Sequence, residues 1–441
     1  MTTDLATQPQ VTTVLTGCHV FDGISGDIAR DRAIEIGVDG RIVAIGDEAS
    51  ILSAAQARGD GNAEVAAVSV RVIDLGGAYL SPGLINMHVH FGLALPGTAG
   101  DLVNSGADAD LLMVMADSAR KTLLAGITTA RLVGESRYLD FALRRGIVAG
   151  AIDGPRVFTA GHALSCTGGH GWDSDALEGD GADDFRRLTR LQIREGADLI
   201  KMCISGGIAG EHEQIQTPQL RDDEMEAIIQ VAHDWGRMVT AHVGPSETLA
   251  RAIHLGLDCV EHGYELTDEV TRLMASKGVW YVPTITVSRC RDFFIEQGVP
   301  QWMMERALGA GPRHWESLQH AIRNGVKIAM GTDMPPAAGY DGTTATVREM
   351  EFMVEAGMSD LDVLRSATSG AAELLGDPTV GTIAVGQHAD FIAMGDDPTT
   401  DISALRSIAW VMKGGRVYRD ELPGSTSPAT GGPRSLAEAR A

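Results

Sequence analysis

Two histidines separated by one residue, His88 and His90, end a short apolar segment that begins at Leu84. The turn-forming residues 81–83 in front of this segment predict that it is a strand. Side chains two positions apart on a strand point to the same face, so both imidazoles can reach one point beyond its end. Imidazole is a good ligand for zinc and similar ions, although two such histidines alone are weak evidence for a metal site.

Four further side chains with ligand chemistry stand at the ends of other apolar segments. They are Lys201, His242, His262 and Asp333. A single histidine at such a place is more often structural, a Thr-Asp pair more often caps a helix, and a lysine more often reaches solvent. Without a metal site, each of these side chains would need its own separate structural explanation, at one strand after another. A shared metal site is the better interpretation.

Lys201 is the most specific member of this set, because an ammonium group repels metal cations. A lysine that is shielded from water favours its neutral form, and a neutral amine can add carbon dioxide to become a carbamate. A carbamate has two oxygens and one negative charge, so it can bridge two ions. The sequence therefore predicts two divalent cations, with zinc as the expected metal, and carbon dioxide bound as N6-carboxylation of Lys201. Cobalt, manganese or iron would also suit such mixed ligands.

The middle of the chain alternates apolar strands with amphipathic helices, which is typical of parallel βαβ units. Eight units favour a (β/α)8 TIM barrel over residues 81–375, with its chemistry at the carboxyl ends of the strands. A doubly wound sheet would carry a glycine-rich phosphate loop, and none is evident. The expected strands are Leu80–Met87, Ile127–Leu132, Arg156–Ala160, Leu199–Met202, Met238–Ala241, Cys259–Val260, Trp280–Pro283 and Lys327–Met330.

Short strands with glycine turns occupy residues 11–80, and a similar pattern returns over residues 376–420. We expect both ends to form one small β-sandwich domain, which makes the fold class α/β. Residues 1–10 and 421–441 are expected to be disordered tails.

Composition excludes several classes of function. A net charge of -23 over 441 residues argues against nucleic-acid binding, which requires basic surfaces. No long uninterrupted apolar stretch predicts a membrane span, and no secretory signal is expected. Five cysteines without a CxxC pair favour a reducing, cytoplasmic location. The expected partners are a small amide or dipeptide substrate and further copies of this chain.

The full set of motifs resembles the binuclear pattern of the amidohydrolase superfamily across nearly the whole chain. The segment 380–391 is similar to that superfamily's return strand, GTIxxGxxAD. Two shorter motifs, at residues 167–171 and 200–207, resemble the branch of metal-dependent dipeptidases and carboxypeptidases that act on Xaa-Pro and related substrates. Amidases that cleave the amide of ochratoxin belong to the same branch.

This resemblance implies two metal subsites bridged by carboxylated Lys201 and a hydroxide, with His88, His90 and Asp333 in one and His242 and His262 in the other. It implies hydrolysis of the C–N bond of a small N-acyl amino acid or dipeptide-like substrate, with Asp333 as general base and then general acid. One alternative is that the same site hydrolyses a carbamate, urea, lactone or phosphoester instead of an amide. Another is a catalytically inactive scaffold with the same fold.

Substrate contacts are expected from loops at the barrel mouth. Either His162 or His170, after the third strand, is predicted to bind the substrate's carboxylate or scissile oxygen, and a structural role is the alternative for each. Tyr264 is predicted to donate a hydrogen bond to the carbonyl oxygen, with simple packing as the alternative.

Three arginines are further candidates. Arg289 and Arg291 follow the seventh strand and could pair with a carboxylate. Arg131 ends the second strand and faces the same mouth if the register of that strand is right.

Overall fold

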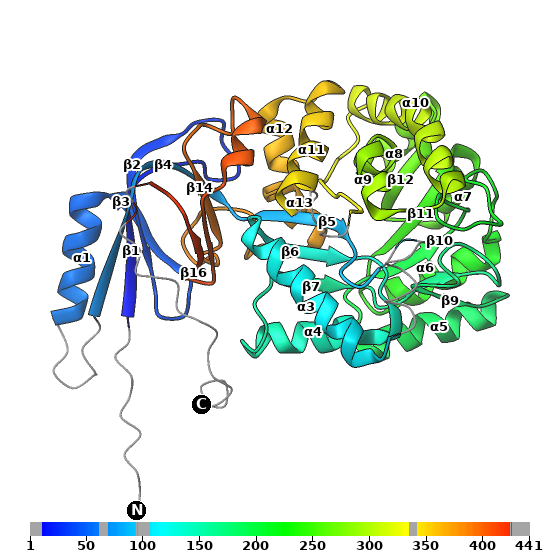
Figure 1. The fold of residues 1–441 in the computed structure, drawn as a ribbon, viewed down its shortest axis with the longest axis horizontal. Coiled ribbons are helices and arrows are strands. Elements are labelled where there is room, and N and C mark those ends of the chain that lie inside the picture. Colours follow the sequence, from blue (N-terminus) through cyan, green and yellow to red (C-terminus); the bar gives the residue numbers. More distant parts are fainter. Residues whose placement is uncertain are drawn as a thin grey trace, which may run out of the picture.

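The computed structural model describes residues 11–60, 69–93, 95, 106–334, 342–423 and 425. The predicted tail 1–10 and nearly all of the predicted tail 421–441 lie outside the described residues. Figure 1 shows two parts side by side, a β-domain that contains the first and last described strands and a larger part in which helices surround strands.

Both ends of the chain contribute to one seven-stranded sheet of order β16-β15-β14-β4-β1-β2-β3. Strand β4 joins the two ends, because it runs parallel to β1 on one side and antiparallel to β14 on the other. Helix α1 (Glu48–Asp60) packs against the N-terminal strands. The strands are β1 (Val11–Val20), β2 (Ala29–Ile36), β3 (Ile42–Asp47), β4 (Ser69–Pro82), β14 (Phe391–Met394), β15 (Trp410–Lys413) and β16 (Arg416–Asp420).

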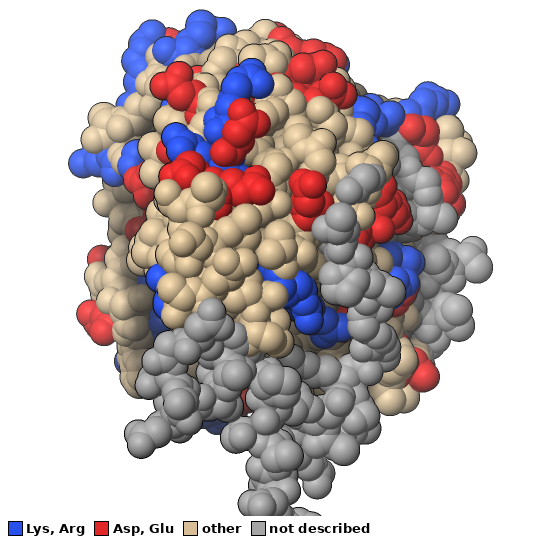
Figure 2. Space-filling view, turned by 90° about the vertical axis from the view of Figure 1, so that its left-hand side faces the viewer, with Lys and Arg blue, Asp and Glu red and all other residues tan. Residues whose placement is uncertain are grey.

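On the described residues of the face in Figure 2, acidic and basic side chains are interspersed around a broad uncharged area. The excess of negative charge is therefore not gathered into one block on this face.

Inside the β-domain, an apolar core unites strands from both ends, with Leu15, Ile34, Phe391 and Trp410 fully buried.

The β-domain leads directly into the barrel, because only Gly83 separates β4 from the first barrel strand, β5 (Leu84–Val89). A Cβ atom at Gly83 would lie 2.2 Å from the Thr128 hydroxyl, so this close approach requires glycine. The amide of Gly83 donates to the Asp390 carbonyl at 2.9 Å. The strand that carries the first histidine is thus held by the β-domain at its start.

The barrel strands run parallel in two hydrogen-bonded groups, and further backbone hydrogen bonds connect one group to the other. Asp198 N donates to Thr159 O at 2.8 Å on one side, and Met87 N donates to Met330 O at 2.9 Å on the other. One group is β5, β6 (Ile127–Leu132) and β7 (Arg156–Thr159), and the other is β8 (Ala163–Ser165), β9 (Ala176–Glu178), β10 (Ile200–Cys203), β11 (Val239–Pro245), β12 (Cys259–Glu265) and β13 (Trp280–Val282).

The predicted eighth strand, Lys327–Met330, is reduced to a parallel bridge between Ile328 and Tyr281. Its backbone groups are divided among several partners, since Ala329 N donates to Tyr281 O and Met330 N donates to Ser366 O, both at 2.9 Å. The segment still closes the ring between β13 and β5. The prediction of an α/β barrel with a separate β-domain is therefore confirmed.

Helices cover the outside of the barrel strands (Figure 1). Their apolar faces join one large core with the strands, in which Met225, Ile228 and Val239 are buried. No described helix is long and apolar enough to span a membrane. The helices are α3 (Asp108–Leu124), α4 (Leu139–Val148), α5 (Ala182–Glu195), α6 (Asp222–Asp234), α7 (Ser246–Leu255), α8 (Asp268–Lys277), α9 (Arg291–Gln297), α10 (Gln301–Arg323), α11 (Gly342–Glu355), α12 (Asp360–Ser366) and α13 (Ser369–Leu375), with short 3-10 turns η1 (Ser136–Tyr138), η2 (Ile285–Ser288) and η3 (Ile402–Ser407).

Candidate metal centre

The predicted ligands converge on one cavity of about 240 Å³ at the carboxyl ends of the barrel strands. Asp333 is central to the cluster, because its Oδ1 atom lies 3.2 Å from Nε2 of both His88 and His90. Its Oδ2 atom lies 3.8 Å from Nδ1 of His262. The residues that the sequence predicted to meet here all line the cavity: His88, His90, Lys201, His242, His262 and Asp333.

The histidine rings form a continuous cluster across the mouth. The His262 ring lies 4.8 Å from the His88 ring and 4.6 Å from the His242 ring, measured between centroids. Possible ligand atoms of His88, His262 and Asp333 all lie within 4.8 Å of one another. Imidazole nitrogens and a carboxylate at this spacing fit a divalent metal ion.

Two of these residues have unusual backbone conformations. His262 and Asp333 have φ values of 64° and 54°, in the left-handed region that residues other than glycine seldom adopt. Surrounding contacts maintain the conformation, since Asp333 N donates to His88 O at 2.8 Å. Such strain concentrates at functional sites, and here it aims both side chains into the cavity.

The electrostatics of two of the histidines favour metal binding, whereas Asp333 raises the pKa of His90 to about 9 against the effect of burial. Burial, together with positive charge on neighbouring groups, holds the pKa values of His242 and His262 well below their usual range. Neutral imidazoles keep a lone pair for a cation. Burial opposes ionisation of Asp333, but the adjacent histidines hold the pKa of this carboxyl well below its usual range.

Lys201 lies on β10 and is 4% exposed. Its Nζ atom forms no hydrogen bond or ion pair with any residue that the structure describes. A buried ammonium group without a partner is unfavourable, so this side chain calls for a ligand that the described residues do not supply.

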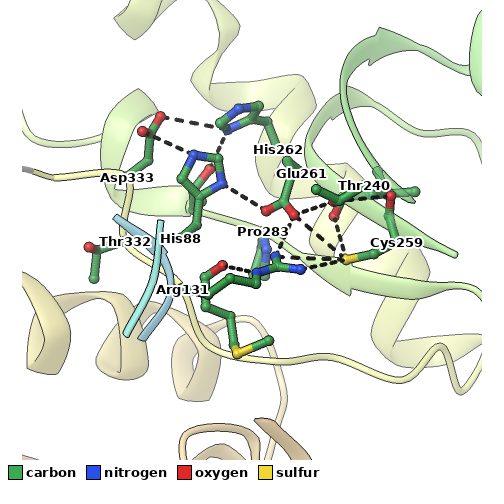
Figure 3. Close-up of polar contacts among 12 residues, drawn as sticks. His88, Arg131, Thr240, Cys259, Glu261, His262, Pro283, Thr332 and Asp333 are labelled. Atoms are coloured by element: carbon green, nitrogen blue, oxygen red, sulfur yellow. Dashed lines mark hydrogen bonds and ion pairs between the residues drawn. The ribbon is translucent and has the colours of Figure 1, made fainter. Parts of the chain in front are cut away.

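Neighbouring groups orient the histidines. His88 Nδ1 lies 2.7 Å from Glu261 Oε2, and His90 Nδ1 lies 2.6 Å from the Gly134 carbonyl. Figure 3 shows the Glu261 carboxylate between His88 and Arg131. Burial opposes the ionisation of Glu261, but Arg131 and His88 lower its pKa to about 2.

A second buried carboxylate supports His262 through a loop. His262 Nδ1 lies 2.7 Å from the hydroxyl of Thr284. Glu349 on α11 accepts hydrogen bonds from the amides of Ile285 and Thr286, at 2.9 and 2.8 Å, directly after Thr284. Neither Glu261 nor Glu349 was predicted from the sequence. Only Glu261 carried a local signal, because an acid inside an apolar strand needs a partner.

A model of the amidohydrolase family matches residues 79–418, from the end of β4 through the barrel to β16. The chain belongs to the amidohydrolase family. The resemblance inferred from the motifs is therefore confirmed, and the protein is a hydrolase that acts on C–N bonds.

This amidohydrolase is 31% identical to ochratoxinase from Aspergillus niger over 375 residues, which cover 77% of this chain and 75% of ochratoxinase. The crystal structure of A. niger ochratoxinase matches 98% of this chain and 100% of that chain, with a TM-score of 0.80 and 26% identity. A Xaa-Pro dipeptidase with methionine bound in its active site matches 92% of this chain and 100% of that chain, with a TM-score of 0.78 and 29% identity.

His170 lies beside the predicted ligands, and its ring stacks on that of His242 with centroids 4.0 Å apart. Its Nδ1 atom lies 2.6 Å from Glu213 Oε1, and the other oxygen of Glu213 accepts from Gln219 at 2.9 Å. Burial would lower the pKa of His170, but the Glu213 charge raises it. No described residue hydrogen-bonds its Nε2 atom, which leaves that atom for a ligand.

His162 and Tyr264 differ in position. Tyr264 lines the cavity and stacks on His262 with ring centroids 5.3 Å apart. His162 lies outside the cavity lining and is used locally, since its Nε2 accepts from Arg137 N at 3.1 Å and its Nδ1 lies 3.2 Å from the Asp175 carbonyl. These contacts fit the structural alternative for His162.

The three arginines do not line the cavity among its described residues. Arg131 lies beneath the ligands, fully buried against Glu261, so the expectation that it faces the mouth was wrong. Its side chain points into the barrel interior because Met87 O and Glu261 are its acceptors there. The exposed Arg289 packs its guanidinium over Trp315, 4.2 Å from the ring centroid.

One wall of the cavity is apolar. Side chains from α9 and α10 and from the loops after β10 and β13 form it, and they belong to one hydrophobic cluster. Asp173 and Asp175 also line the cavity. The apolar residues that line the cavity include Ile208, Val287, Phe293, Phe294, Met303 and Met334.

Proposed function

We propose that this amidohydrolase uses two divalent cations, with zinc as the expected metal, to hydrolyse the C–N bond of a small N-acyl amino acid or dipeptide-like amide. The observation that carries the proposal is the buried amine of Lys201, which has no polar partner among the described residues and lies among four histidines and Asp333. Carboxylation of this amine by carbon dioxide converts it into an anion that suits a site for two cations.

When bound, the cations would lower the pKa of a shared water and polarise the scissile carbonyl. Asp333, whose carboxylate lies in the cavity beside His88 and His90, would take the proton of the attacking water and deliver it to the leaving nitrogen. His170 and Tyr264 both line the cavity, and each has a group, Nε2 or the hydroxyl, that can donate to the substrate's carbonyl oxygen.

The apolar wall supports a substrate with a bulky hydrophobic group next to the scissile bond. The names of two relatives, ochratoxinase and Xaa-Pro dipeptidase, support the choice of amides and dipeptides. Carbamates, ureas, lactones and phosphoesters are alternative substrates of the same centre. A cytoplasmic location and a homo-oligomeric assembly stay predictions from the sequence.

The proposal is tested by measuring metal in the purified protein and by screening N-acyl amino acids and dipeptides with the zinc-loaded enzyme. Close to two ions per chain and release of a free amino acid from an aromatic or proline conjugate are expected. A folded protein that binds no added zinc would support the inactive scaffold instead.

Replacing Glu213 by glutamine is expected to lower kcat/KM about tenfold and to move the basic limb of the pH profile to lower pH. The sign follows from the Glu213 charge, which raises the pKa of His170. Without that charge, burial lowers the pKa, so protonated His170 is lost at a lower pH. Glu178→Gln is the control, because the exposed carboxylate of Glu178 accepts a hydrogen bond from the amide of Gly168 in the same loop region. Equal pH profiles for the wild type and Glu213→Gln would contradict this role for His170.

Shortening Phe293 to leucine or alanine is expected to raise KM about tenfold for substrates with an aromatic acyl group, because contact with the apolar wall is lost. KM for a small acetyl substrate should change little. The ratio of the two kcat/KM values is the measurement, since it is independent of the amount of folded enzyme. Ile295→Ala, an exposed change on the same helix, is the control.

A further inference from the structure

We propose that Glu261 is a positioning residue for the metal centre: Arg131 secures one of its oxygens, and the other fixes the orientation and tautomer of His88. The inference rests on the proposed metal centre, for which His88 is a ligand. Figure 3 shows a continuous series of contacts that runs from Asp333 to His88, from His88 to Glu261 and from Glu261 to Arg131.

The two oxygens of Glu261 have different partners. Oε1 accepts from the Arg131 guanidinium at 2.5 Å and from the Thr240 hydroxyl, and the Cys259 thiol lies 3.7 Å away. Oε2 lies 2.7 Å from His88 Nδ1. Since these donors surround one oxygen, the carboxylate cannot rotate without losing them, and Oε2 stays directed at His88.

This contact decides which nitrogen of His88 carries the proton. An ionised carboxylate only accepts hydrogen bonds, so Nδ1 must be the donor. The lone pair is then on Nε2, which faces Asp333 Oδ1 at 3.2 Å and His90 Nε2 at 3.3 Å. A carboxylate behind a metal-binding histidine also increases the basicity of the ligating nitrogen.

Arg131 acts on the same ligand through the backbone. Its Nε atom donates to the carbonyl of Met87 at 2.6 Å, and Met87 directly precedes His88. One guanidinium therefore holds both the peptide that carries the ligand and the carboxylate that orients it. Arg131 and Glu261 are both fully buried.

The conformation of β12 allows this arrangement. Consecutive residues of a strand normally point to opposite faces, but Glu261 and His262 both reach the His88 cluster. The positive φ of His262 breaks the alternation and brings both side chains inward. A buried ion pair alone is a weak source of stability, so its position behind a ligand indicates a role in the centre.

The test compares Glu261→Gln with Asp140→Asn. Asp140 is an equally buried carboxylate that accepts from Thr159 at 2.5 Å and touches none of the ligands. Metal affinity is measured by competition with a chelator, and ligand geometry by the visible spectrum of the cobalt-substituted enzyme. Glu261→Gln is expected to weaken binding of one of the two ions by about 10- to 100-fold and to change the spectrum. Asp140→Asn should lower the free energy of unfolding with neither effect.

Loss of the Glu261 charge leaves Arg131 buried without a counter-ion, so the single variant can fail to fold. The double variant Arg131→Gln with Glu261→Gln removes both charges, and it should fold while keeping the loss of metal affinity. Wild-type affinity and spectrum in either folded variant would overturn the inference, and so would an equal loss in Asp140→Asn. Absence of metal binding by the wild type would instead overturn the proposed function.

Discussion

Replacing Lys201 by alanine is expected to reduce hydrolysis by about 10³-fold or more and to release metal, because transition-state stabilisation worth several kcal/mol depends on the ions. Alanine leaves the histidines and Asp333 in place but removes the one lysine among the described residues that line the cavity, and with it the carbamate that could bridge two cations. Metal content and kcat are the two measurements. Both should fall together.

Two controls test whether this result comes from the proposed carbamate on Lys201. Lys413 is another lysine shielded from water, and its Nζ donates to the Gly154 carbonyl at 2.6 Å, so Lys413→Ala should keep metal and turnover. Reconstitution of metal-free wild type should also be slower in buffer depleted of carbon dioxide. Unchanged metal content and turnover in Lys201→Ala would refute the carbamate assignment.

The second large effect is expected at Asp333, which has two functions in the proposed reaction. Asp333→Asn keeps the size of the side chain but cannot take a proton from water, so kcat should fall by about 10² to 10⁴-fold. Because the asparagine side chain carries no negative charge, Asp333→Asn should lower metal affinity as well. Measuring kcat at saturating zinc separates the two functions, because excess metal restores occupancy but not proton transfer.

Asp333→Glu is the matched variant for this experiment. It retains a carboxylate that can bind metal, but the longer side chain moves the oxygen that faces His88 and His90. We expect Asp333→Glu to keep a larger fraction of the wild-type metal affinity than of the wild-type kcat. A zinc-saturated Asp333→Asn enzyme with wild-type kcat would show that another group transfers the proton.

The convergence of the six predicted ligands could be expected from the sequence because they stand at the ends of five apolar segments, with His88 and His90 sharing the first. In a barrel of parallel strands, the carboxyl ends meet at one mouth, so local patterns alone determine which residues converge. The same logic predicted that both chain ends form a second domain. The prediction of a regular eighth strand was wrong. Lys327–Met330 divides its backbone hydrogen bonds among β13, β5 and α12 and so does not form a regular ladder.

The supporting residues could not be predicted in the same way. Arg131 and Glu261 are 130 positions apart, and Thr286 and Glu349 are 63 apart, so no local pattern connects them. Whether a strand-end arginine faces the mouth or the interior depends on register, which a short apolar run leaves open. His162 and His170 both looked suitable for substrate binding, and only their neighbours in space, Arg137 and Glu213, distinguish them.

Strand β4 has a consequence for the order in which the molecule is assembled. It runs into the strand that carries His88, yet its partner on one edge, β14, is synthesised only after the entire barrel. A nascent chain that has just left the ribosome exit tunnel up to α13 therefore has every predicted metal ligand but lacks β14, the strand that completes the pairing of β4. Translation must reach the final strands before the support of the first ligand is complete.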